Sequence, residues 1–165
     1  MIDLWQHLGP VFDIREEVYP ELDVANLSLL ATKRLVEYLL ENTRSIHTEF
    51  RTFMSEDVVQ IHSPKRMVEG IITGELIGAL GGEVTIDHCI IPELVFFFEE
   101  PGFITMNYAP GATWDSLKLT TLFEFFRMMR VLDSRITVRL SPYFFPPNWI
   151  ARFDETFKLY MSENS

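Results

Sequence analysis

The alternation of apolar and polar residues predicts two long helices. In residues 24–41, apolar side chains recur every three or four positions, and Asp23 precedes them where a capping residue is expected. Residues 114–132 carry a much wider apolar stripe behind Thr113, which leaves only a narrow polar strip. We therefore expect this second helix to be covered on more than one side.

Two further helices are indicated by their start signals. Ser63 followed by proline begins one at residues 63–80, and Asn148 is placed to cap another that ends near residue 161. Gly70, Gly74 and Gly78 recur at a four-residue spacing, so they would share one face of the first of these helices. Glycine is unfavourable inside a helix, so this pattern suggests that another backbone approaches closely there.

Short apolar runs between turn residues predict the strands. Two form a hairpin, three form an antiparallel meander and one stands alone, with the ranges 50–53, 58–61, 84–89, 94–99, 103–108 and 135–140. Residues 94–98 are apolar on both faces, which is typical of a central strand buried on both sides. Residues 1–22 contain Gly9-Pro10 and Pro20, so they are interpreted as an irregular arm or short helix.

The predicted order is α-ββ-α-βββ-α-β-α. Because the strands cluster and do not strictly alternate with helices, the class is α+β, a mostly antiparallel sheet with packed helices. No repeat, low-complexity tract or flexible linker interrupts the chain, so residues 1–165 are expected to form a single domain with an arm-like N-terminal segment at residues 1–22.

Charge is distributed very unevenly along the chain. The net charge is −10, yet residues 113–165 hold 6 acids against 7 Lys/Arg, so the excess lies before them. No Lys or Arg occurs between Arg66 and Lys118. Negative surface repels phosphate, which disfavours nucleic acid and anionic membranes and favours a basic protein partner. The candidate partner-binding acids are Glu69, Glu75, Glu83, Asp87, Glu93, Glu99 and Glu100.

No motif in the sequence indicates catalysis, a metal or a cofactor. Cys89 is the single cysteine, and in a strand it would point away from its neighbour His88, so the two cannot form a catalytic pair. The four histidines lack metal-ligand spacing, and no glycine-rich segment has the form of a phosphate loop. The lone cysteine, together with the absence of a signal-peptide pattern, leads us to expect a cytoplasmic protein.

The connection at residues 141–150 is rich in proline and aromatic residues. Tyr143 and Trp149 are candidates for anchoring a partner, because such rings contribute large contact areas at little entropic cost. The alternative is that these aromatic side chains fold back and close one end of the core.

These observations favour a non-catalytic acidic protein-binding module, for which an immunity or inhibitor protein that neutralises a basic partner such as a toxin is the leading hypothesis. One alternative is a small enzyme or ligand-binding domain with a pocket between helix 114–132 and the sheet. Another is a dimeric chaperone or assembly factor, which would use the unusually apolar helix or the glycine stripe in a homodimer. A further alternative gives the acidic residues no role beyond solubility.

Overall fold

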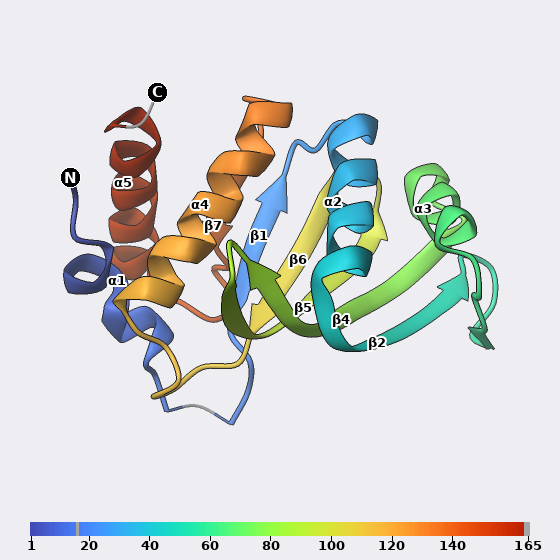
Figure 1. Ribbon diagram of the computed structural model, residues 1–165, viewed down its shortest axis with the longest axis horizontal. Coiled ribbons are helices and arrows are strands. Elements are labelled where there is room, and N and C mark those ends of the chain that lie inside the picture. The colour runs from blue at the N-terminus through green and yellow to red at the C-terminus, as the bar shows by residue number, and fades with distance from the viewer. Residues whose placement is uncertain (16, 164–165) are drawn as a thin grey trace.

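One antiparallel sheet of seven strands carries five helices in the computed structural model, which describes residues 1–15 and 17–163 (Figure 1). The helices are α1 Leu4–Phe12, α2 Leu29–Asn42, α3 Pro64–Thr73, α4 Ser116–Leu132 and α5 Pro147–Glu163. The strands are β1 Glu21–Ala25, β2 Thr43–Thr52, β3 Val58–Val59, β4 Leu76–Ile86, β5 Cys89–Glu100, β6 Phe103–Tyr108 and β7 Thr137–Leu140. The predicted α+β class is confirmed.

The strands lie in the order β3-β2-β4-β5-β6-β1-β7, and each neighbouring pair is antiparallel. The meander β4-β5-β6 forms the centre, with β5 in the middle position, as the run at residues 94–99 predicts. Strand β1 lies between β6 and β7, so the N-terminal part of the chain is built into the sheet.

Helices α2 and α4 lie over the near face of the sheet in Figure 1, and α1 and α5 stand beside α4 at the β7 edge. Along β5, Leu94, Phe96 and Phe98 are buried beneath the helices, while Phe97 between them keeps 36% of its surface exposed. The expectation that this strand is buried on both sides is therefore wrong. Its apolar run reflects one buried face and one face that is apolar but uncovered, which we call the open face.

Helix α4 lies at the centre of the helical layer. The ring of Phe125 contacts Tyr38 of α2 and Phe96 of the sheet, with centroids 5.7 and 6.5 Å apart. On another side of α4, Phe123 contacts the rings of Phe153 and Phe157 in α5. The wide apolar stripe of this helix is thus covered from several directions, as its sequence predicts.

The N-terminal segment contains the short helix that was one of its two expected forms, but it is not an arm. It forms α1, whose Leu8 and Phe12 are fully buried, and then the interior strand β1. Asp23 lies within this strand, and Ser28 caps α2 instead by accepting a hydrogen bond from the Ala31 backbone N–H. The short β1 was missed because its apolar residues also fit the helical spacing of the residues that follow.

The predicted glycine stripe does not exist, because α3 ends at Thr73. Gly74 ends it with a left-handed φ of 74°, and Gly78 lies in β4. A Cβ atom at Gly78 would lie 2.0 Å from the carbonyl oxygen of Glu49. A close approach of two backbones is therefore real, but it joins β2 to β4.

Several boundaries also shift. Strands β4 and β5 are joined by the two-residue turn Asp87–His88, both with positive φ, so His88 is not in a strand. Helix α4 is capped by Asp115 and not by Thr113, and α5 begins at Pro147. Strand β2 is longer than predicted and β3 shorter, because β2 gains its length by pairing with β4, a partner distant in sequence.

A buried hydrogen bond joins α1 to the sheet and yields a stability prediction. The hydroxyl of Tyr108 donates to the carbonyl oxygen of Val11 over 2.8 Å, and burial raises the pKa of this phenol. We expect Tyr108→Phe to lower the free energy of unfolding by about 1–2 kcal/mol, since the carbonyl loses its partner in a buried site. Urea denaturation measures this, with Tyr143→Phe on the 91% exposed Tyr143 as the unaffected control.

Candidate functional site

The open face of the sheet contains a groove of about 440 Å³ over β2, β4 and β5. Its apolar floor is formed by Ile77, Ala79, Val95 and Phe97. The charged and titratable residues that line it are Glu49, Glu56, Glu99, Arg51 and His47. An apolar floor within a mostly acidic rim is the arrangement expected of a surface that receives a basic partner.

The strand register explains why the floor is hollow. Ala79 lies between Glu49 on β2 and Phe97 on β5, and the next residue across is Thr105 on β6. Because alanine has a short side chain, the ring of Phe97 and the carboxylate of Glu49 border a depression and do not meet a bulky neighbour. Strand pairing thus brings together residues that are far apart in the sequence.

A cluster of three polar side chains lies at one end of the groove. His47 on β2 extends across β4 to within 3.8 Å of Glu93 on β5, and the Tyr19 hydroxyl donates to Glu93 over 2.9 Å. Gly81 lies beneath the imidazole, where an added Cβ would come within 2.9 Å of its Nε2 atom. The hydrogen bond to the carboxylate raises the pKa of Tyr19. The absence of a side chain at Gly81 therefore lets His47 reach Glu93.

Further acids lie on the same face at β1. Leu22 and Val24 point into the core, so Glu21 and Asp23 lie on the open face, where Asp23 is opposite Arg139. Burial, together with the neighbouring carboxylate of Glu21, raises the pKa of Asp23. Among the described residues, neither Glu21 nor Glu49 nor Glu99 forms an ion pair. The open face is acidic even though Arg51 and Arg139 lie at its edges.

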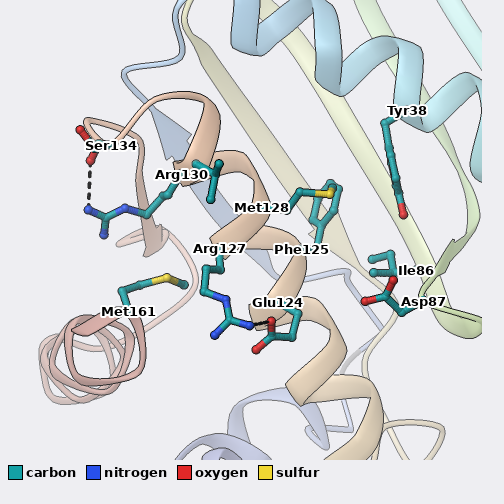
Figure 2. A pocket seen from close by; sticks show the side chains of 11 residues that line it. Tyr38, Ile86, Asp87, Glu124, Phe125, Arg127, Met128, Arg130, Ser134 and Met161 are labelled. Atoms are coloured by element: carbon teal, nitrogen blue, oxygen red, sulfur yellow. Dashed lines mark hydrogen bonds and ion pairs between the residues drawn. The ribbon is translucent and has the colours of Figure 1, made fainter. Parts of the chain in front are cut away.

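A second hollow lies on the helical side, between α4 and the far end of β4 (Figure 2). Its volume is about 570 Å³, and Tyr38 of α2, Asp87 of the β4–β5 turn and Met161 of α5 complete its walls. The alternative of a small-molecule site predicts a pocket between this helix and the sheet, and the hollow occupies that place.

The polar groups of this hollow hold helices together. Glu124 accepts hydrogen bonds from Arg127 on its own helix and from the Tyr160 hydroxyl on α5, so both of its oxygens are engaged. Burial raises the pKa of Tyr160, and burial with the nearby Asp87 raises that of Tyr38. The Glu124 carboxylate thus already joins α4 to α5.

The other chemical candidates remain separate from one another. Within residues 1–15 and 17–163 no cluster of three or more His, Cys, Asp or Glu is arranged to hold a metal ion. Cys89 is a free, half-buried thiol at the start of β5. No helix in the described part of the chain is long and apolar enough to cross a membrane.

The seven acids predicted to bind a partner do not gather in one place. Glu69 and Glu75 form ion pairs with Lys65 and Arg66 near α3, and Asp87 lies at the opposite end of β4 from Glu75. Glu93 and Glu99 do share the open face. The remaining two are exposed in strands, Glu83 beside Arg44 and Glu100 at the end of β5.

The acids that complete the open face were missed by sequence reasoning. Glu49 and Glu21 lie outside the segment without basic residues, and only strand pairing brings them onto the same face of the sheet as Glu99 and Glu93. A local signal did exist, since Glu49 and Glu21 each occur one residue from a buried strand position, which assigns them to the outward face.

The aromatic residues of the connection after β7 divide between the two interpretations. Tyr143 is 91% exposed, whereas Phe145 is buried in the core. Trp149 is half-buried, and the guanidinium of Arg152 lies 5.2 Å from its ring centroid. Tyr143 therefore remains a candidate anchor. It follows β7, at the opposite edge of the sheet from the groove.

Comparison with known proteins yields little. No protein-family model and no curated protein matches the sequence. Among solved structures, the chain shows a partial likeness to a chain of the crystal structure of the toxic C-terminal tip of CdiA from Pseudomonas aeruginosa in complex with immune protein. The TM-score is 0.49 at 12% sequence identity, over 76% of this chain and 88% of that chain. A likeness of this degree carries no argument about function.

The raised pKa of Asp23 gives a pH-dependent prediction. In the folded protein this carboxyl releases its proton at higher pH than in the unfolded chain, so folding stability declines as pH rises through the folded pKa. We expect Asp23→Asn to stabilise the protein at pH 7 by no more than about 1 kcal/mol, because the side chain is only partly buried. Near pH 3 the gain should disappear.

Thermal or urea unfolding across this pH range measures the effect, with Glu155→Gln on the exposed side of α5 as the control. A destabilised Asp23→Asn protein at pH 7 would show that attraction to Arg139 outweighs burial and the repulsion from Glu21.

Proposed function

We propose that this chain is a non-catalytic, acidic protein-binding module of the immunity or inhibitor kind, which neutralises a basic protein partner such as a toxin. The observation that carries the proposal is the open face, where an apolar groove is bordered by Glu49 and Glu99, two carboxylates with no ion-pair partner among the described residues. In this proposal the partner covers Phe97 and Val95 with apolar contacts, while its basic residues meet Glu49, Glu93 and Glu99.

The two components of this surface would act on different steps of binding. Unpaired carboxylates attract a positive partner from a distance, so they raise the association rate and make it depend on salt. The ring of Phe97 is already 36% exposed, and covering it would slow dissociation. Glu49 and Glu99 therefore act as steering residues, and Phe97 acts as the anchor.

Two observations favour binding over the alternatives of solubility and catalysis. A carboxylate that serves only solubility does not need a site where burial and a like charge oppose its ionisation, as they do at Asp23. In the hollow beside α4, Glu124 is held by Arg127 and Tyr160, which leaves it little freedom to exchange protons with a substrate. A free thiol at Cys89 accords with the reducing cytoplasm, where we propose that the protein acts.

Charge reversal on the open face tests the proposal. A partner is first captured from the native host with the wild-type chain and purified, and its binding is then measured by surface plasmon resonance over a salt series. We expect Glu49→Lys and Glu99→Lys each to lower the association rate about tenfold at low ionic strength, with a smaller effect at high salt. Phe97→Ala should raise the dissociation rate about tenfold.

The matched control is Glu155→Lys, which makes the same change in net charge on the exposed surface of α5. If the captured partner is basic and only the open-face variants weaken its binding, the proposal is supported. If Glu155→Lys has the same effect as Glu49→Lys, or if neither salt nor reversal changes the rates, the open face is not the binding surface.

A further inference from the structure

A second uncovered apolar surface lies on the helical side, at the groove between α2 and α4. Five large apolar side chains near these helix ends are at least 41% exposed, among them Val131 at 82% and Leu29 at 60%; the others are Leu30, Met128 and Leu132. The Ser28 side chain lies close enough to the Asp133 carboxylate to contribute, after Arg135, to the lowered pKa of that group, which places the start of α2 beside the end of α4. Scattered exposed apolar residues are ordinary, but a group of this size usually marks an interaction surface.

The apolar surface is continuous along the groove. A hollow of about 400 Å³ between the two helices is lined by Tyr38, Phe125, Met128 and Val131, which also line the hollow shown in Figure 2. In that view Met128 points from α4 toward Phe125 and the side of the groove where Tyr38 lies. We call this continuous surface the α2–α4 groove.

Charge changes sign from one end of the groove to the other. Arg34 and Arg130 lie toward the end where α2 begins and α4 finishes. Glu41 and Asp87 lie toward the other end, and neither forms an ion pair within the described chain. Arg34 and Glu41 are two helical turns apart on α2, so they face the same direction. Arg34 has Glu37 as a partner, 3.4 Å away, but its side chain is 60% exposed.

This arrangement is complementary to a rotated copy of itself. A two-fold axis through the middle of the groove would exchange its ends, so that the basic end of one copy meets the acidic end of the other. We propose that the α2–α4 groove is the interface of a homodimer, in which Arg34 of each copy approaches Glu41 of the other. Val131 of each copy is then covered by the opposite end of its mate's groove, and Met128 lies nearer the axis.

The homodimer is independent of the proposed function. The α2–α4 groove lies in the helical layer and the acidic groove lies on the opposite face of the sheet. Dimerisation therefore leaves both open faces free, and the assembled protein presents two of them.

Sedimentation equilibrium of the purified chain from about 1 to 200 μM tests the interface. We expect a species of twice the chain mass of 19.3 kDa. Val131→Glu should weaken the dimer at least tenfold, because it places an unpaired charge within an apolar interface, opposite the acidic end of the mate's groove. The matched control is Leu117→Glu, which also introduces glutamate on α4, at a residue that is 66% exposed and lies outside the groove.

Circular dichroism shows whether Val131→Glu still folds. If it does not, exchanging the charges of Arg34 and Glu41 provides a second test of the interface. Arg34→Glu and Glu41→Arg should each weaken the dimer, and the double variant should restore it, because each altered residue again meets its opposite charge. A monomer at every concentration would overturn the proposal. So would a dimer that Val131→Glu and both single charge variants leave intact.

Discussion

The packing of α4 against the centre of the sheet is the contact on which the rest of the architecture depends. Phe125 lies between β5 and α2, and Phe123 lies among the aromatic rings of α5, so one helix sets the positions of its neighbours on two sides. Because its apolar stripe is wide, α4 can be buried only if other helices stand beside it on the same face. The helical layer is complete on that face, and the other face of the sheet is left without a cover.

A sheet with one bare face must keep that face compatible with water, and this chain does so with carboxylates. Placing carboxylates on this face has an electrostatic cost at Asp23, because burial and the carboxylate of Glu21 both make its ionisation less favourable. Floor residues such as Phe97 nevertheless remain partly exposed between the acids. The combination of exposed apolar area with unpaired charge is what separates a binding surface from a merely soluble one, and it connects the layered fold to the proposed recognition of a basic partner.

Close contact between β2 and β4 shapes this surface further. At Gly78 the backbone of β2 passes where a side chain would otherwise stand, and at Gly81 the imidazole of His47 crosses toward Glu93. Both glycines lie in β4, the strand that forms the middle of the groove between β2 and β5. The shape of the groove is therefore a property of backbone packing as much as of the residues that line it.

The sequence by itself determined the α+β class, the central place of β5 and the need to cover α4, because hydrophobic periodicity and turn residues act over a few neighbouring positions. Only the tertiary structure decided that β1 enters the sheet between β6 and β7, and that Phe97 faces outward while Phe96 faces inward. It also decided which acids share a surface: Glu49 and Glu99 line the same groove, whereas Glu75 forms an ion pair with Arg66. Such neighbours depend on the register between strands far apart in the chain and on which face of the sheet the helices cover. Neither can be predicted from a local sequence pattern.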